Sequence, residues 1–335
     1  MKKSGFLVSL LVVGGIFAVV WRLRGDSNGA ESNPPEAGST TTNVAPGASG
    51  TPPQGGQTTT VAKTGADELF DAGVKAAQAG DIATAKKKFA DAMKRFPSEP
   101  AAARGAVKLA MILRKEGDDF EARNVLSAAL AGLNDGHERQ EAVKLLDRLN
   151  GELVFGRKKS PDSIAYVVKS GDALARIGKA YRITPEFIKR INYLTSDLIH
   201  PGDQLKVFQG PFDVVIEKAK FRLSVHRNGI FIKEYMIGLG KNDSTPTPEG
   251  EFVVTNKMID PPWDPQGPEF AASGAPDNPL GTRWIEFAPH YGIHGTVEPK
   301  SIGKEASRGC IRLLNKDVEE LYDLVAYGSN VTIRP

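Results

Sequence analysis

The chain has 335 residues, a quarter of them charged, with a net charge of +3 and a single cysteine. This length is too great for one ordinary domain, and the composition changes sharply several times along the chain. The mild charge and the lack of a glycine-rich phosphate loop or a basic aromatic stripe argue against nucleic acid as a partner. A basic surface is compatible with anionic wall polymers, and one cysteine excludes a disulfide within the chain.

Residues 1–24 have the pattern of an export segment. Two lysines precede an apolar run from Gly5 to Trp21, which predicts either a secretory signal peptide or a membrane anchor. No small-x-small cleavage site follows the run, so an uncleaved anchor in the cytoplasmic membrane is the favoured interpretation. The rest of the chain would then lie in the cell envelope, in the periplasm or the cell wall.

Residues 25–65 are dominated by Gly, Pro, Ser and Thr. With almost no large apolar side chain, this segment cannot bury enough surface to fold, and we expect a disordered linker. A flexible chain of about 40 residues has an r.m.s. reach of roughly 30 to 40 Å. Such a tether would hold the folded part away from a membrane surface.

Residues 66–156 are rich in Ala, Lys, Leu, Glu and Arg at helical spacing, which predicts packed amphipathic helices. Gly80-Asp81 recurs 37 residues later as Gly117-Asp118, so the region contains an internal repeat of helical hairpins. Small residues where helices should cross, and a proline after the second helix, resemble the tetratricopeptide repeat. The resemblance implies a concave groove for a protein partner, while a plain spacer or docking bundle is the alternative.

The sequence pattern of residues 165–208 predicts a strand, two short helices and a second strand. A Gly-Asp turn follows the first strand, and a His-Pro-Gly-Asp turn precedes the last. This order resembles the LysM module, which implies binding to N-acetylglucosamine-containing glycans such as peptidoglycan; a degenerate module kept for packing is the alternative. Tyr181 and Tyr193 could stack on sugars, but aromatics at this spacing are more often core. The residues expected at the groove between the two strand/helix loops are Gly171, Asp172, His200 and Pro201.

Residues 212–335 are predicted to be mostly β. Asn228-Gly229 marks a hairpin turn, and Lys316 to Tyr327 has the apolar face of one helix. Strands are expected around residues 214–216, 222–226, 231–233 and 251–254. The expected fold class is therefore multidomain, with a β-sandwich-like C-terminal domain, a small βααβ module, an α-helical repeat region and an N-terminal membrane anchor.

Residues 260–281 are rich in Pro, Gly and Asp, with Trp263 and Phe270 as the large apolar residues. A loop of this length without periodicity is usually functional or disordered. We expect a lid over a cleft, with a plain surface insertion as the alternative.

The single cysteine lies in the segment Ser-Arg-Gly-Cys-Ile-Arg at residues 307–312, shortly after His294. A solitary thiol in an exported protein is an accident, an intermolecular bridge or a reactive nucleophile. Its neighbours favour the nucleophile, because an imidazole can accept the thiol proton and two nearby guanidinium groups lower the cost of the thiolate. Gly309 permits a tight turn that presents backbone N–H groups to an oxyanion.

Two other interpretations of this segment exist. Cys310 could be a small buried hydrophobe, with His294 a satisfied core or loop histidine. His290 and His294 could form a metal pair, but a proline and two glycines interrupt the segment, so a helix presenting both rings on one face is not expected. We therefore expect neither a metal nor a cofactor.

Several separated motifs, in the right order, resemble the L,D-transpeptidase catalytic domain, also called the YkuD domain, over roughly residues 212–334. The motifs are Pro246 to Phe252, Pro276 to Gly281, Gly292 to Thr296 and Ser307 to Leu313. The resemblance implies a YkuD-like fold and a cysteine peptidyl transferase that releases the terminal D-Ala of a peptidoglycan stem tetrapeptide through a thioester. An amine of another stem then accepts the acyl group in a 3-to-3 crosslink. With water or a protein amine as acceptor, the enzyme would be an L,D-carboxypeptidase or a protein-to-wall transferase.

Carried over residue by residue, the resemblance makes Cys310 the nucleophile and His294 the general base, with the amides of Gly309 and Cys310 as oxyanion donors. Many members have histidine before the Gly-Cys pair, where this chain has Arg308. Arginine cannot act as a base, so His294 must act alone. The replacement keeps open an inactive wall-binding adaptor. Substrate contacts are expected at Arg312, Arg308, Ser307, Gly295 and Trp263.

Overall fold

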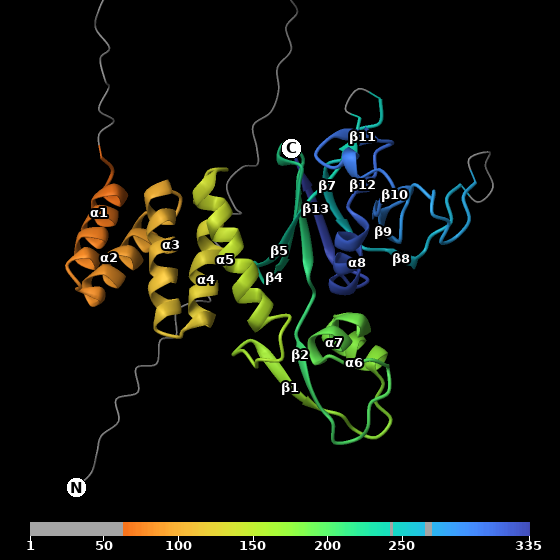
Figure 1. Cartoon of the computed structure of the whole chain (residues 1–335), viewed down its shortest axis with the longest axis horizontal. Helices are drawn as coiled ribbons and strands as arrows, with labels where there is room; N and C mark the ends of the chain where they lie inside the picture. The colour runs from red at the N-terminus through yellow and green to blue at the C-terminus, as the bar shows by residue number, and fades with distance from the viewer. Residues whose placement is uncertain (1–62, 242–243, 265–269) are drawn as a thin grey trace, which may run out of the picture. The chain divides into compact units, whose positions relative to one another are not determined.

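The computed structural model describes residues 63–241, 244–264 and 270–335 (Figure 1). The expected anchor at residues 1–24 lies outside this part of the chain, as does all but the end of the expected linker at residues 25–65. Within the described residues, no helix combines the length and the apolar character needed to cross a membrane.

The region predicted to be helical consists of helices in the structure (Figure 1). The repeated Gly-Asp pairs occupy equivalent places: Asp81 and Asp118 each cap a helix by accepting a backbone hydrogen bond from three residues on, at 3.0 and 3.1 Å. The glycine before each aspartate has a positive φ, 81° at Gly80 and 85° at Gly117. The internal repeat is thus visible as two helix pairs with matching turns. The elements are α1 (Gly65–Gln78), α2 (Ile82–Arg95), α3 (Pro100–Lys115), α4 (Asp119–Ala129), η1 (Leu130–Gly132) and α5 (His137–Leu153).

Small residues let these helices approach closely. A Cβ at Gly73 would lie 2.5 Å from the Phe89 ring, and Ala85 and Ala92 are completely buried beside it. Helix α2 ends at Arg95, two residues before the proline that cannot continue it. These contacts form the core of the helical region.

The second region has the predicted order of strand, helix, helix and strand. Strands β1 and β2 pair antiparallel, from Ser163 opposite Phe208 to Val167 opposite Gln204. Tyr181 packs edge-on against Tyr166 at a centroid distance of 5.8 Å, whereas Tyr193 is 57% exposed. The elements are β1 (Ser163–Val167), α6 (Leu174–Tyr181), α7 (Pro185–Asn192) and β2 (Gln204–Phe208).

The C-terminal region is mostly β, as predicted. One sheet has the order β5-β4-β3-β13-β7 and another the order β12-β10-β9-β8, and a short pair joins β11 to β6. Phe252 of the first sheet packs on Phe287 of the second, at a centroid distance of 5.3 Å. The first sheet contains β3 (Asp213–Glu217), β4 (Arg222–Arg227), β5 (Ile230–Met236), β7 (Gly250–Val253) and β13 (Asn330–Arg334). The others are β6 (Leu239–Gly240), β8 (Asn256–Ile259), β9 (Arg283–Ala288), β10 (Tyr291–His294), β11 (Glu305–Ser307) and β12 (Ile311–Arg312), with short turns η2 (Lys218–Lys220) and η3 (Pro299–Ser301).

Two local predictions in this region can be compared with the structure. Asn228 and Gly229 have positive φ values of 51° and 77° between β4 and β5, as a tight hairpin turn requires. Helix α8 (Asn315–Leu324) is shorter than the helix predicted for Lys316 to Tyr327. It ends because Val325 adopts extended backbone, at φ −85° and ψ 130°.

The helical region contacts the edge of the first sheet, which the sequence did not predict. Asn150 of α5 is completely buried, and its Nδ2 donates to the carbonyls of Phe231 and Ile232 at 3.0 and 2.9 Å. The Phe231 N–H donates to the Ser127 hydroxyl at 2.7 Å. Side chains of α4 and α5 therefore satisfy the free edge of β5, which would otherwise be open to pairing with another chain.

Candidate active site

The register of the second sheet sorts its side chains onto two faces. Ile285, Ile293 and Ile311 stand in one row across β9, β10 and β12, and all three are completely buried. Because successive side chains of a strand point to opposite faces, the neighbouring row lies on the other face. That row consists of Met258, Trp284, His294 and Arg312.

Cys310 directly precedes β12 and stands two residues before Arg312, which pairs with His294 in the register of β10 and β12. The Gly292 backbone amide, two residues before His294 on β10, donates toward the Cys310 thiol, so the thiol lies near the strand that carries His294. The structure thus brings together the two residues that the sequence singled out for catalysis.

His294 is 4% exposed, and its Nδ1 lies 2.6 Å from the Gly295 carbonyl oxygen. A carbonyl only accepts hydrogen bonds, so Nδ1 carries the proton and Nε2 keeps its lone pair. Burial, and to a smaller degree the Arg312 charge, lower the pKa of His294 from 6.5 to about 4, an effect that the backbone carbonyls of Gly295 and Leu280 partly offset. The ring is therefore a neutral base at physiological pH.

Cys310 is partly exposed, and its Sγ lies 3.7 Å from the His290 carbonyl oxygen. Burial raises the pKa of the thiol, while the Gly292 amide and the Arg312 charge act in the opposite direction. Among the described residues, no hydrogen bond joins Sγ to the His294 ring. The resting site thus holds a neutral thiol beside a neutral imidazole.

The turn before Cys310 is built around Gly309, whose φ is +105°. A Cβ there would lie 2.8 Å from the Tyr291 ring. The Gly309 N–H donates to the Ser307 hydroxyl at 3.1 Å, and this hydroxyl donates to the Cys310 carbonyl at 2.5 Å. Ser307 is buried and braces the turn. The amides of Gly309 and Cys310 are the predicted oxyanion donors. The Gly309 N–H already donates to Ser307, whereas the Cys310 N–H has no acceptor in the described part of the chain and can therefore donate to an oxyanion.

The two arginines near the thiol differ in their surroundings. The Arg312 Nη1 donates to Glu298 Oε2 at 2.7 Å, while its Nε is buried without an acceptor among the described residues. Arg308 is exposed. A substrate carboxylate that binds Arg312 would have to share it with Glu298.

Asn315, at the start of α8, is a site residue that the sequence reasoning missed. Its Oδ1 accepts a hydrogen bond from the Thr296 N–H at 3.0 Å. A Cβ at either Gly281 or Gly295 would lie 2.1 Å from this oxygen. Gly295, predicted to contact substrate, therefore makes room for Asn315 and fixes the loop after His294. The only signal in the sequence was an asparagine before a helix, which resembles an ordinary cap.

Trp284 is the second residue that was missed. Its ring stacks on His294, with centroids 5.9 Å apart and an interplanar angle of 24°. A Cβ at Gly292 would lie 2.6 Å from the indole, so the lack of a side chain at Gly292 makes room for this ring. The indole Nε1 is buried without an acceptor among the described residues. No local pattern marks this tryptophan, because its strand reads as an ordinary buried strand.

The lid expected at residues 260–281 joins β8 to β9. Strand β9 lies next to β10, which carries His294. Trp263 and Ala271 exchange two backbone hydrogen bonds, of 2.9 and 3.1 Å, and the Asn278 side chain donates to the Pro261 carbonyl at 2.6 Å. These bonds close the base of the loop around residues 265–269, which the structure does not describe. A substrate contact at Trp263 stays a prediction.

The loops predicted to bind glycan are joined by their backbones. The Val168 N–H donates to the Asp203 carbonyl at 2.9 Å, and the Gly202 N–H donates to the Val168 carbonyl at 2.8 Å. Asp172 is held within its own loop, where its Oδ2 accepts from the Tyr166 hydroxyl and the Lys169 N–H, both at 2.7 Å. Gly171, Asp172, His200 and Pro201 thus lie on adjacent loops, and their contact with glycan stays a prediction.

Within the described ranges, no three His, Cys, Asp or Glu side chains gather in a way that could hold an ion.

Comparison with known proteins agrees with this geometry. The model of the L,D-transpeptidase catalytic domain matches residues 211–333, and that of the LysM domain matches residues 166–208. The chain is 33% identical to the putative L,D-transpeptidase YkuD of Bacillus subtilis over 177 residues, which are 51% of this chain and 98% of that protein. It is 40% identical to the putative L,D-transpeptidase YqjB of the same organism over 126 residues, 36% of this chain and 69% of YqjB.

Among solved structures, the NMR structure of the catalytic domain from the E. faecium L,D-transpeptidase is 24% identical, covers 37% of this chain and 96% of that chain, and has a TM-score of 0.31. The match to nearly the whole length of YkuD, with both domains recognised in the order LysM then catalytic domain, establishes the family. The chain belongs to the YkuD-type L,D-transpeptidases.

Proposed function

We propose that this protein is a peptidoglycan L,D-transpeptidase that forms 3-to-3 crosslinks through a thioester on Cys310. The observation that carries the proposal is that His294 pairs with Arg312 across β10 and β12, two residues after Cys310, while its Nδ1 donates to the Gly295 carbonyl, so that the neutral ring keeps a lone pair on Nε2. Catalytic hydrogen bonds are often long in unliganded enzymes, so a rotation of the thiol toward Nε2 would complete the pair.

In the first step the Cys310 thiol gives its proton to His294 Nε2, and sulfur attacks the carbonyl carbon that precedes the terminal D-Ala of a stem tetrapeptide. The C–S bond forms, the C–N bond breaks, and the proton passes from Nε2 to the departing amine of D-Ala. In the second step an amine of another stem attacks the thioester carbonyl and gives a proton to Nε2; the new C–N bond forms, the C–S bond breaks, and the proton passes from Nε2 to the departing sulfur, which restores the thiol.

Two further groups have roles in these steps. The Cys310 N–H is the proposed donor to the oxyanion, because it lies at the attacking residue and has no acceptor among the described residues. Arg312 is the proposed clamp for a substrate carboxylate, through the buried Nε that has no acceptor in the described part of the chain.

The other regions would place the enzyme on its substrate within the cell envelope. The LysM module would hold it on glycan and raise the local concentration of stem peptides. The helix pairs, which we take to be tetratricopeptide-like, would offer a surface to a protein partner. The N-terminal segment would anchor the chain in the membrane.

Reverse-phase separation and mass spectrometry of soluble products test the proposal. Incubation of the full chain with a stem tetrapeptide should yield free D-Ala together with a dimer joined through the third residues. Tripeptide without dimer would identify a carboxypeptidase that uses the same acyl-enzyme, and a peptide attached to an added protein amine would identify a protein-to-wall transferase. No release of D-Ala would favour an inactive adaptor.

A further inference from the structure

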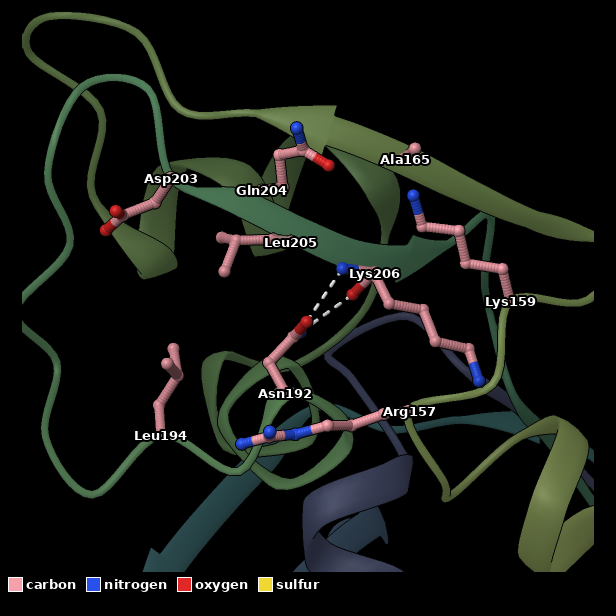
Figure 2. Close-up of a pocket in the computed structure, with 9 residues that line it drawn as sticks. All are labelled: Arg157, Lys159, Ala165, Asn192, Leu194, Asp203, Gln204, Leu205 and Lys206. Atoms are coloured by element: carbon pink, nitrogen blue, oxygen red, sulfur yellow. Dashed lines mark hydrogen bonds between the residues drawn. The ribbon is translucent and has the colours of Figure 1, made fainter.

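A pocket of about 410 Å³ lies between β2, the end of α7 and the segment that follows α5 (Figure 2). This volume is in the range of small-molecule sites. Leu194 and Asp203 belong to the loop between α7 and β2 that also carries His200 and Pro201, whereas no residue of the loop at 168–172 lines the pocket; the pocket therefore adjoins the predicted groove on one side. Its lining residues are Arg157, Lys159, Ala165, Asn192, Leu194, Asp203, Gln204, Leu205 and Lys206.

The pocket is held together by Lys206, which is 5% exposed. Its Nζ donates to three carbonyl oxygens at the end of α5, those of Leu153 at 2.7 Å, Val154 at 3.3 Å and Gly156 at 2.7 Å. The Asn192 side chain accepts from the Lys206 N–H at 2.7 Å and donates to its carbonyl at 2.8 Å, as Figure 2 shows. The segment after α5 is therefore fixed against the LysM module before any ligand arrives.

Two cations of that segment reach the pocket. The Arg157 guanidinium lies over the exposed Tyr193 ring, 4.7 Å from its centroid, and Figure 2 shows its side chain extending beneath Asn192 toward Leu194. Arg157 and Lys159 are exposed and make no ion pair within the described part of the chain, whereas Lys158 between them pairs with Asp119 at 3.1 Å.

One acidic side chain, that of Asp203, lines the pocket. Its carboxylate accepts a hydrogen bond from the His200 N–H at 2.7 Å and lies 3.7 Å from the His200 Nδ1. Leu194 and Leu205 form an apolar side, and the Gln204 amide supplies hydrogen-bonding groups. Cations beside an apolar wall and an amide suit a sugar that carries a carboxylate, since sugars have apolar faces and polar edges.

We propose that this pocket binds a carboxylate-bearing glycan and gives the LysM module a preference for acidic over neutral N-acetylglucosamine polymers. The ligand chemistry is a carboxylate attached to a sugar, either on the sugar itself, as in muramic acid, or on a stem peptide. The proposal rests on the proposed function only in taking peptidoglycan as the source of that glycan.

Calorimetric titration of the full chain tests the preference. The probes are chitotetraose, which is neutral, and a tetrasaccharide of alternating N-acetylglucosamine and N-acetylmuramic acid, with and without stem peptides. We expect the acidic glycan to bind about 10-fold more tightly than chitotetraose at low salt, with the ratio shrinking as salt rises. Preference for the peptide-free acidic glycan would locate the carboxylate on the sugar, and preference only for the peptide-bearing form would locate it on the stem.

The double variant Arg157→Ala/Lys159→Ala should bind both glycans with equal affinity, while Lys158→Ala, the matched control, keeps the wild-type ratio. An unchanged ratio in the double variant, or equal affinity for the two glycans in the wild type, would overturn the proposal. Tighter binding of a neutral or phosphate-bearing polymer would do the same. Acylation of Cys310 by a free tetrapeptide should be identical in the double variant, so a failure of the pocket is distinguishable from a failure of the proposed reaction.

Discussion

The catalytic face and the LysM loops differ in how deeply their polar side chains are buried, although backbone hydrogen bonds hold both in place. At the catalytic face the reactive ring of His294 is buried, stacked and tied to a carbonyl, and this burial sets its protonation state. In the LysM loops His200 is exposed and Asp172 is half-buried, and the two loops are joined by backbone hydrogen bonds. Proton transfer needs a dry, fixed environment, whereas glycan binding needs an open surface that is already ordered.

The largest effect is expected from the base. The variant His294→Ala should lower the rate of Cys310 acylation about 10²- to 10⁴-fold at neutral pH, since no other described group replaces Nε2. His290→Ala is the matched control, because this histidine contacts the thiol through its carbonyl and not through its ring. Stopped-flow or quenched mass measurements follow the rate. An unaltered rate and pH profile in His294→Ala would mean that another base acts.

A smaller effect on acylation is expected from Asn315, whose side chain holds the loop that follows His294. Asn315→Ala leaves the buried Thr296 N–H without its acceptor, which should lower the free energy of unfolding by about 1–3 kcal/mol and slow acylation about 10-fold. Asn315→Asp retains an oxygen that can accept this bond, so it should recover most of the lost stability and most of the lost acylation rate. Denaturant unfolding with parallel acylation assays measures the two effects. If Asn315→Ala behaved as wild type in both assays, the hydrogen bond from Thr296 to Asn315 would not be needed for stability or acylation.

The stacked tryptophan should control the pH dependence. Because the pKa of His294 is depressed to about 4, the unfolded chain binds the proton first as pH falls below 6.5, and stability is lost between pH 6.5 and about 4. Trp284→Ala would admit water, raise the pKa of His294 and move the acid limb of the acylation profile to higher pH. Trp284→Phe keeps a ring and should keep the limb near its wild-type position. Identical acid limbs in all three proteins would contradict this role.

The smallest effect is expected at the exposed loops. Asp172→Ala removes the carboxylate that accepts from the Tyr166 hydroxyl and the Lys169 N–H, and should weaken pelleting with peptidoglycan about 3- to 10-fold. Acylation by a soluble tetrapeptide should not change. Asp197→Ala, which removes only an exposed pairing with Lys189, serves as the control. If Asp172→Ala slowed acylation as well, the two regions would not be separable.

Much of this arrangement could be predicted from local sequence. The Gly-Asp turns, the strand order of the LysM module and the motif around Cys310 each depend on residues close together in the chain, where turn chemistry and periodicity are informative. The pairing of His294 with Cys310 was inferred from their residue types and nearness in sequence and then from the family resemblance, and the β10–β12 register sets His294 opposite Arg312, two residues after Cys310.

What could not be predicted depends on contacts between distant residues. Asn315 reaches back to Thr296, Trp284 occupies space left by Gly292, and Asn150 of the helical region closes the edge of β5. Each looks ordinary in its own segment, as a cap, a strand aromatic or a helix polar residue. The helix predicted to run to Tyr327 was too long because apolar periodicity continued past the point where the backbone becomes extended.

The most direct test of the central claim is intact-protein mass spectrometry of the full chain incubated with a stem tetrapeptide or a carbapenem, beside Cys310→Ala. We predict a covalent adduct on the wild type, with the mass of the ligand acyl group, and none on the variant. An adduct on Cys310→Ala, or no adduct on the wild type with either ligand, would contradict the assignment of Cys310 as the acylated nucleophile.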